Sequence, residues 1–123
     1  MVPERNTAAG RFDKSIELVF VAIQKDFPLL VNAILFARES IANYQFCGIR
    51  IIVPDSQVSE CNVHLSSLDL IEVQVISESI FVGESTVVKL RQTFGKRSNW
   101  ILQQIIKLMA VASSKADATL IVD

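Results

Sequence analysis

The residues whose spacing best suits chemistry lie near the end of the chain, in the segment "SNWILQQIIKLMAVAS". Four residues there stand at positions i, i+3, i+4 and i+7, which places their side chains on one face of a helix. They are Trp100, Gln103, Gln104 and Lys107. A face of this composition is also typical of a helix surface in contact with water. Trp100 and the nearby Arg97 favour a binding face, because an indole can stack on a ligand and a guanidinium can donate to phosphate or sugar oxygens.

Polar residues that follow apolar runs form a second candidate set. In an open parallel sheet, ligands bind beyond the carboxyl ends of the strands, so residues at these positions are candidates for contact. Any single one of them is also typical of a loop exposed to water. Together they predict a ligand site at one edge of the sheet, formed by the turn after the first run and by Asp55. The members of this site are Ala22, Ile23, Gln24, Lys25 and Asp55, and the last apolar run ends at Asp123.

Several common classes of site have no support in the sequence. No GxGxxG fingerprint follows the first apolar run and no GxxxxGK[ST] motif occurs, which argues against a nicotinamide enzyme and a P-loop NTPase. His64 is the single histidine, and Cys47 and Cys61 do not form a CxxC pair, so a structural zinc site has too few ligands. Cys61 and His64 are interpreted as loop residues rather than as a nucleophile and its base.

The candidate residues need a scaffold, and the first half of the chain predicts a strand, a helix and a second strand. The apolar run "SIELVFVAI", residues 15–23, is typical of a strand that is covered on both faces. Residues 24–44 predict a helix, with Asp26 as its cap and Pro28 in its first turn. Residues 49–53 predict a second strand, which should lie parallel to the first.

The second half of the chain continues this alternation less regularly. Residues 56–69 are interpreted as a loop or short helix. Residues 70–76 predict a strand near a sheet edge, because apolar and polar residues alternate there. Residues 77–97 have no firm period and predict a helical turn and a loop, with breaks at Gly83 and Gly95.

The last helix and strand have clearer signals. Ser98 or Asn99 can cap a helix that continues from Trp100. The segment "ATLIVD", residues 118–123, then predicts another strand. We expect the buried face of the helix to be a wide apolar stripe, formed by Ile101, Leu102, Ile105, Leu108, Met109 and Ala112.

The alternation of strands with helices predicts an α/β fold with an open, mainly parallel sheet and flanking helices, of the Rossmann-like kind. We expect residues 1–14 to be a flexible lead-in and residues 15–123 to belong to one domain. Hydrophobic residues make up 50% of the 123, which is enough to form a folded core.

Charge and hydropathy exclude other partners. The formal net charge of -1 gives no electrostatic basis for nucleic-acid binding. No apolar run reaches the roughly 18 to 20 residues of a transmembrane helix. Residues 1–15 lack the apolar core of a secretory signal, so we expect a cytoplasmic location.

The end of the chain resembles a known group of proteins. The segment "GKRSNWILQQIIKLMAVASSKADATLIVD" is similar to the stretch that leads to the Asp-x-Asp motif in bacterial domains of unknown function related to A-type glycosyltransferases. The segments "VFVAIQKDFPLLVNAILFARESI" and "IRIIVPD" resemble the nucleotide-binding unit of the same group. This implies that residues 15–123 are the N-terminal, nucleotide-binding part of one domain. Residues 22–25 would then supply backbone contacts to the nucleotide, and Asp55 would contact its base or ribose. Asn99 departs from the pattern, because a glycine is expected there. The residues that match are Trp100, Gln103, Gln104, Lys107 and Leu108.

The resemblance implies a glycosyltransferase that transfers a sugar from a nucleoside diphosphate sugar, with Mn²⁺ or Mg²⁺ bridging the diphosphate. It implies that Asp123 is the first carboxylate of the metal motif, and that a substrate and phosphate face lies on and beside the last helix. Because the second acidic residue would follow Asp123, we expect an N-terminal fragment that is inactive alone and self-associates through exposed apolar surface. The residues of the face are Arg97, Trp100, Gln103, Gln104 and Lys107.

Two other functions stay open at this point. One is a nucleotidyltransferase-type enzyme, since a similar sheet also binds nucleoside triphosphates. The other is a non-catalytic α/β module whose polar helix face binds another protein.

Overall fold

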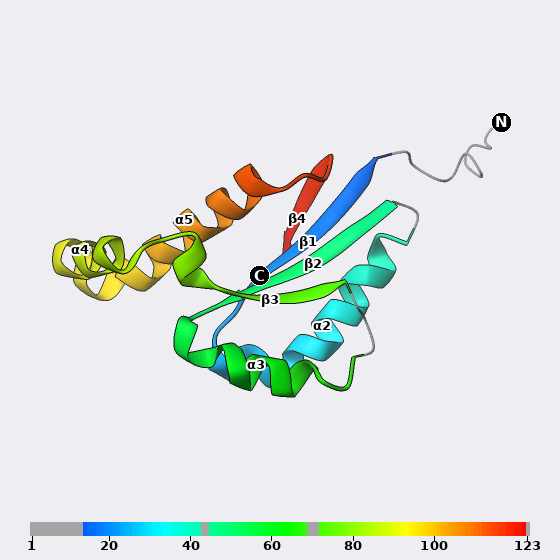
Figure 1. Ribbon diagram of the computed structural model, residues 1–123, viewed down its shortest axis with the longest axis horizontal. Coiled ribbons are helices and arrows are strands. Elements are labelled where there is room, and N and C mark those ends of the chain that lie inside the picture. Colours follow the sequence, from blue (N-terminus) through cyan, green and yellow to red (C-terminus); the bar gives the residue numbers. More distant parts are fainter. Residues whose placement is uncertain (1–13, 43–44, 69–71, 123) are drawn as a thin grey trace.

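Four parallel strands form the centre of the protein. The computed structural model describes residues 14–42, 45–68 and 72–122. The strands lie side by side in the order β3-β2-β1-β4 (Figure 1). This arrangement confirms the predicted open α/β fold, while the predicted lead-in over residues 1–14 falls outside the described residues except for Lys14. The strands are β1 (Ser15–Val21), β2 (Gln45–Val53), β3 (Val73–Ser77) and β4 (Ala118–Val122).

Helices cover both faces of this sheet (Figure 1). On one face lie α2 (Phe27–Ser40) and α3 (Val58–Leu65), which connect β1 to β2 and β2 to β3. On the other face lie α4 (Glu84–Phe94) and α5 (Ser98–Ser113), which connect β3 to β4. The sheet is therefore wound in two directions from β1, and two of the described α-helices cover each of its faces.

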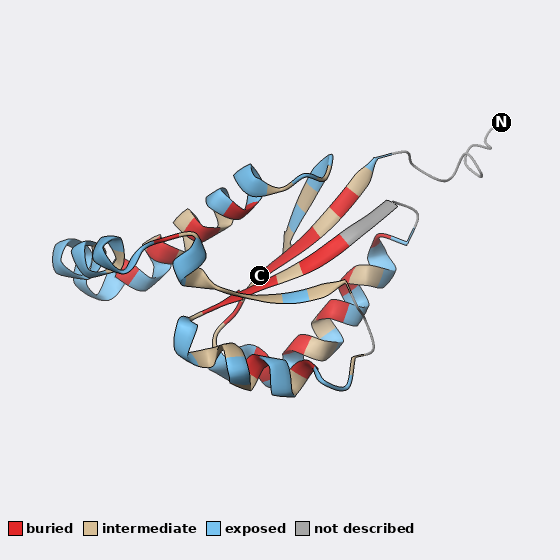
Figure 2. Ribbon diagram, in the orientation of Figure 1, coloured by how far each residue is buried: buried red, intermediate tan, exposed pale blue. Residues whose placement is uncertain are grey.

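The apolar run of β1 forms a strand because its two faces contact two separate cores. Leu18 and Phe20 pack with α2 and α3, whereas Val19 packs with α5. Leu18 and Val19 are fully buried, and Figure 2 shows buried residues concentrated in β1 and β2. Burial on both sides explains why the sequence shows a continuous apolar run rather than an alternating one.

The segment after β1 begins with a short 3-10 helix, η2 (Gln24–Asp26), before α2 starts at Phe27. The predicted range, residues 24–44, is therefore longer than the α-helix itself, which covers Phe27–Ser40. Pro28 lies in the first turn as predicted. Asp26 precedes the helix, but its carboxylate accepts a hydrogen bond from the backbone nitrogen of Ile23 at 3.2 Å rather than capping α2.

The largest error of the sequence prediction concerns α4, because a helical turn and a loop were expected there. Gly83 and Gly95 do break the chain as predicted, and they mark the two ends of this helix. Gly95 has a φ of 55°, a conformation that favours glycine. None of the residues of α4 is buried, and only Val87 and Leu90 pack against the core, so its apolar signal in the sequence is weak.

Two further elements differ from the prediction. The strand β2 begins at Gln45, four residues before the predicted start. The segment interpreted as a loop or short helix contains α3, so Cys61 and His64 lie on a helix and not in a loop. Cys61 is buried, and burial raises the pKa of its thiol to about 11, which makes it a packing residue rather than a nucleophile at neutral pH.

The helix α5 also buries a narrower stripe than expected. Its buried residues lie four positions apart, as in a single ridge packed against the sheet. Three members of the predicted apolar stripe are exposed, because they lie outside this ridge: Leu108, Met109 and Ala112. Ser98 was a predicted cap, yet it is buried and lies inside the helix, which Arg97 precedes. The buried residues are Ser98, Leu102, Ile106 and Ala110.

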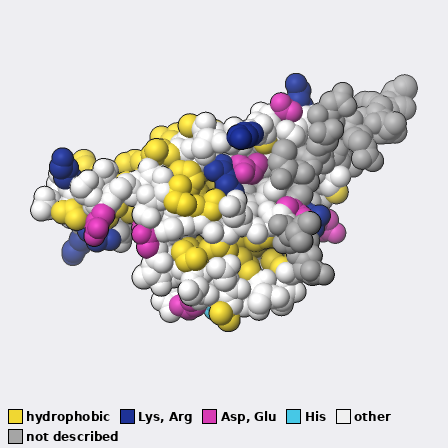
Figure 3. All heavy atoms as spheres, in the orientation of Figure 1, with side chains coloured by type: hydrophobic (Ala, Val, Ile, Leu, Met, Phe, Trp, Pro, Cys, Tyr) yellow, Lys and Arg dark blue, Asp and Glu magenta, His cyan; other side chains and the backbone are white. Residues whose placement is uncertain are grey.

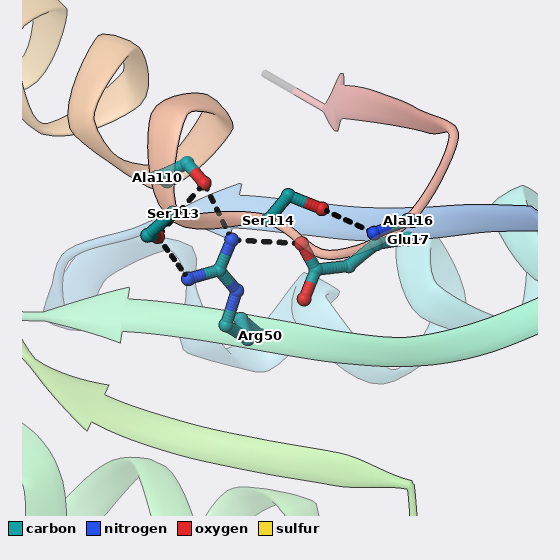
Figure 4. A network of polar contacts seen from close by, with 6 residues as sticks. All are labelled: Glu17, Arg50, Ala110, Ser113, Ser114 and Ala116. Carbon is teal, nitrogen blue, oxygen red and sulfur yellow. Dashed lines mark hydrogen bonds and ion pairs between the residues drawn. The ribbon is translucent and has the colours of Figure 1, made fainter.

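A charged residue of β2 fixes the C-terminal end of α5 (Figure 4). The guanidinium of Arg50 donates to the carboxylate of Glu17 at 2.7 Å and to the carbonyl oxygen of Ala110 at 2.6 Å. It also donates to the hydroxyl of Ser113 at 2.9 Å. Carbonyl groups at the C-terminal end of a helix lack intrahelical partners and attract cations, which favours this contact. The Arg50 side chain thereby joins α5 to β1 and β2.

Apolar side chains remain on the surface of several elements. On the face in Figure 3, hydrophobic side chains reach the surface in patches between scattered charges. On the last helix and strand, Leu108, Val111 and Leu120 are 71%, 46% and 42% exposed. Self-association stays a prediction. In the described part of the chain, no helix is both long and apolar enough to cross a membrane.

Candidate functional site

Three of the strands lead into short 3-10 helices at one edge of the sheet. These helices are η2, η3 (Asp55–Gln57) and η4 (Glu78–Ile80), which follow β1, β2 and β3. From β1 the chain proceeds to β2 and β3 on one side, and it returns on the other side of β1 as β4. In open α/β sheets, ligands bind outside the carboxyl ends of the strands at such a switch of direction.

Two adjoining cavities lie at this edge. One has a volume of about 390 Å³ and lies against the end of β1 and the start of α5. The other has a volume of about 510 Å³ and lies against η4 and α4. The two share four lining residues, Pro54, Ser56, Glu78 and Arg91, so we describe them together as the carboxyl-edge crevice. The first is also lined by Ile23, Gln57, Asn99, Leu102 and Gln103, and the second by Asp55, Ser79, Val82, Glu84 and Val87.

Asp55 is the predicted site residue that the structure supports most clearly as a crevice residue. Its Oδ1 accepts a hydrogen bond from the hydroxyl of Ser77 and another from the backbone nitrogen of Ser79, at 3.1 Å for the latter. The bond from Ser77 is the main cause that lowers the pKa of Asp55 below its ordinary value, and Ser79 adds to it. These bonds favour the ionised carboxylate and orient it in the crevice.

Glu78 and Arg91 are the two charged residues among the four that line both cavities. Glu78 is partly buried, and burial is the main cause that raises the pKa of its carboxyl group, with the charge of Asp55 as a second cause. The positive charge of Arg91 acts in the opposite direction. The second cavity thus has three carboxylates, from Asp55, Glu78 and Glu84, and one guanidinium. This part of the crevice can accept hydrogen bonds from hydroxyl and amino groups.

Fewer backbone N–H groups of the turn after β1 are available to a ligand than the sequence predicted. The backbone nitrogen of Ala22 donates to the carbonyl oxygen of Ile52 at 3.0 Å, and that of Ile23 donates to Asp26. The backbone nitrogen of Gln24 donates to Oε1 of Gln57 at 2.7 Å. Three of the four backbone nitrogens predicted to contact a nucleotide, those of Ala22, Ile23 and Gln24, therefore already donate within the protein, and contact through any of them has to replace one of these bonds.

The two long side chains of that turn lie outside the crevice lining. The side-chain amide of Gln24 donates to Glu60 of α3 at 3.1 Å, and both Gln24 and Lys25 are exposed. Ile23 is the predicted residue of this turn that lines the crevice. Ala22 is buried and lines a separate apolar cavity of about 260 Å³ on the α2 side.

Of the residues predicted to form a binding face on the last helix, only some lie at the crevice. Gln103 lines it, next to Asn99 and Leu102. Gln104 and Lys107 are half-buried and are not lining residues. Trp100 is 63% exposed, and Arg97 is exposed in the turn before α5.

The metal prediction falls on a position that the structure does not describe. Asp123 lies outside the described residues. Among residues 14–42, 45–68 and 72–122, no group of three or more histidine, cysteine, aspartate or glutamate side chains is arranged to hold a metal ion.

Several crevice residues were not predicted from the sequence. Ser77, Glu78 and Ser79 directly follow or end β3, so the rule that selected Asp55 would also have selected them. Arg91 could not be found in this way, because it lies on the helix that was expected to be a loop. Gln57 lies four residues beyond the end of β2, and its contact with Gln24 joins positions 33 residues apart.

The chain was also compared with known proteins. No curated protein sequence and no solved structure matches it. The sequence profile of one family matches residues 17–123, which is most of the chain and includes the crevice and all of the four strands except the first two residues of β1. The chain therefore belongs to a family of unknown function, DUF6492.

Proposed function

We propose that this chain is the nucleotide-binding part of an A-type glycosyltransferase-like protein, and that it binds a nucleoside diphosphate sugar in the carboxyl-edge crevice. One observation carries the proposal: the crevice lies at the carboxyl ends of β1, β2 and β3, beside the switch between β1 and β4. The resemblance of the last helix and strand to the segment before an Asp-x-Asp motif gives the class of ligand.

The charges of the crevice give an orientation for this ligand. Asp55 and Glu84 repel phosphate groups but accept hydrogen bonds from hydroxyl and amino groups, so the ribose and base belong at the ends of β2 and β3. The diphosphate then extends toward the start of α5, where Gln103 lines the crevice. Lys107 lies in this helix and Arg97 directly precedes it, and both are proposed to face the phosphate or sugar oxygens.

A divalent cation, Mn²⁺ or Mg²⁺, belongs to the proposed full activity. Such ions prefer several oxygen ligands, and the described residues supply no cluster of three acidic side chains arranged for one. We therefore assign only Asp123 as a proposed ligand and derive no chemical step from the metal.

The proposal is tested by calorimetric titration of the 123-residue chain with nucleoside diphosphate sugars, nucleoside diphosphates and nucleoside triphosphates. We expect saturable binding of a nucleoside diphosphate or its sugar. Tighter binding of triphosphates than of diphosphate sugars would instead favour a nucleotidyltransferase-type enzyme. If no nucleotide binds at millimolar concentration, the proposal is wrong and an interaction module becomes the better account.

A pair of matched variants locates the site. Asp55→Asn keeps the shape of the side chain and removes its charge, and we expect roughly tenfold weaker binding. Asp117→Asn makes the same change at the other end of the sheet, where Asp117 accepts hydrogen bonds from the backbone nitrogen and hydroxyl of Ser15. Both carboxylates are held by serine donors, so the two variants should lose similar stability. An equal effect of both variants on nucleotide affinity would contradict this location.

A further inference from the structure

The side chain of Gln57, in the short helix after β2, contacts the turn after β1. Gln57 is the last residue of η3, and its Oε1 lies 2.7 Å from the backbone nitrogen of Gln24. A backbone N–H can only donate, so the oxygen of the amide must face Gln24. The NH₂ group of the same amide is therefore turned away from Gln24, and its orientation is fixed by this bond.

The cavity that Gln57 lines is rich in hydrogen-bond donors. Two more side-chain amides, Asn99 and Gln103, come from the first turns of α5, and Arg91 adds a guanidinium from α4. Glu78 is the one carboxylate among the residues that line this cavity. Asp55 and Glu84 line the neighbouring cavity instead. The crevice is therefore divided into a donor-rich part against β1 and α5 and a carboxylate-rich part against η4 and α4.

We infer that Gln57 is a specificity residue, which donates a hydrogen bond from its side-chain NH₂ to an acceptor oxygen of the bound nucleotide. This inference rests on the proposed function and adds a contact that the resemblance does not supply. The acceptor is a carbonyl oxygen of the base or an oxygen of the diphosphate, since both have the same chemistry toward an amide donor. A donor held in place before binding loses little conformational freedom on contact, which favours affinity.

A second role of Gln57 has to be separated from this one, because the bond to Gln24 also stabilises the fold. Gln57→Glu separates the two roles. A glutamate has nearly the same shape, and its carboxylate still accepts from the backbone nitrogen of Gln24, but it has no NH₂ group and adds a negative charge. Gln57→Ala removes both the donor and the acceptor. Gln74→Glu is the matched control, because it adds the same charge at the cavity near Glu17 and Arg50, at the other end of the sheet.

The test is titration of the chain and its three variants with the nucleoside diphosphate that binds it best. We expect Gln57→Glu to weaken binding at least tenfold while its melting temperature stays within a few degrees of the unchanged chain. Gln57→Ala should weaken binding and also lower the melting temperature. Gln74→Glu should leave the affinity within about twofold. If Gln57→Glu binds the nucleotide as tightly as the unchanged chain does, Gln57 only supports the turn after β1 and the inference is wrong.

The same titration with the matching nucleoside, which lacks the phosphates, identifies the acceptor. A loss of affinity of equal factor for the nucleoside and the diphosphate indicates a carbonyl oxygen of the base. A loss seen only for the diphosphate, in Gln57→Ala as well as in Gln57→Glu, indicates a phosphate oxygen, because Gln57→Ala adds no charge that repels phosphate. If the unchanged chain binds no nucleotide at all, the proposed function fails and this inference fails with it. That result differs clearly from unchanged affinity in a chain that does bind.

Discussion

Nη2 of Arg50 lies 2.6 Å from the carbonyl oxygen of Ala110, so a residue of a central strand bonds directly to the last turns of α5. The same nitrogen lies 2.7 Å from Glu17, and the side chains of Arg50 and Glu17 are only 13% and 15% exposed. At the other end of α5, Asn99 and Gln103 line the crevice. The position of these crevice residues therefore depends on a helix that Arg50 holds at its opposite end.

Arg50→Met should lower the free energy of unfolding by about 3 kcal/mol, because it leaves the largely buried carboxylate of Glu17 without its partner. The control is Arg38→Gln, which affects the more exposed pair of Arg38 with Glu72, whose side chains are 39% and 26% exposed. That change should cost less than about 1 kcal/mol. Urea denaturation of both variants measures the difference, and equal losses would contradict the role of Arg50.

Glu78→Gln should stabilise the protein at neutral pH. Burial raises the pKa of Glu78 in the folded state above its ordinary value of 4.5, so ionisation is easier in the unfolded chain. The stability that a protonated Glu78 contributes is present below that value and is lost as the pH rises through the folded-state pKa. The variant should therefore unfold at a higher temperature than the unchanged chain at pH 7, with no gain below about pH 4. A gain of equal size at both pH values would point to a cause other than ionisation.

Lys107→Ala should weaken nucleotide binding more than it affects stability, if Lys107 faces phosphate or sugar oxygens. We expect roughly fivefold to tenfold weaker binding, as for the loss of one charge-assisted hydrogen bond. The control is Lys89→Ala on α4, at a residue that is exposed and is not among the crevice residues. A lower melting temperature of Lys107→Ala with unchanged affinity would show instead that Lys107 has a structural role.

Leu120→Lys should reduce self-association of the chain. Leu120 lies on β4, which is an edge strand of the sheet, and its side chain is 42% exposed. An edge strand with exposed apolar side chains can pair with another chain, and a lysine there opposes such pairing. Sedimentation velocity should show oligomers for the unchanged chain and a shift toward monomer for the variant. A stable monomer of the unchanged chain at high concentration would show that no such association occurs.

The fold could be predicted from the sequence wherever burial leaves a strong local signal. The run around Leu18 and Val19 predicts a buried strand because both of its faces contact a core. No such signal exists for α4, where Val87 and Leu90 pack only partly and the other residues are polar or exposed. A helix that covers little of the core has little apolar pattern to detect.

Residues of the candidate site could be predicted from the sequence only where the position of a single residue after a strand is enough to select it. Asp55 lies two residues after the end of β2, so the rule of strand ends selects it. Gln57 acquires its proposed role through Gln24, and Arg91 through the position of α4 beside Glu78. These relationships arise from contacts between distant segments, which spacing in a single sequence does not reveal.

The most direct test of the central claim is NMR mapping of nucleotide binding on the ¹⁵N-labelled chain. Titration with a nucleoside diphosphate should shift the backbone amide signals of the crevice, above all those of Gln24, Ser56, Gln57, Ser79 and Asn99. The signals of Ser113 to Ala116, which surround Arg50 at the other end of the sheet, should stay unchanged and serve as the internal control. Shifts confined to that opposite end, or no shifts at saturating nucleotide, would contradict a nucleotide site in the carboxyl-edge crevice.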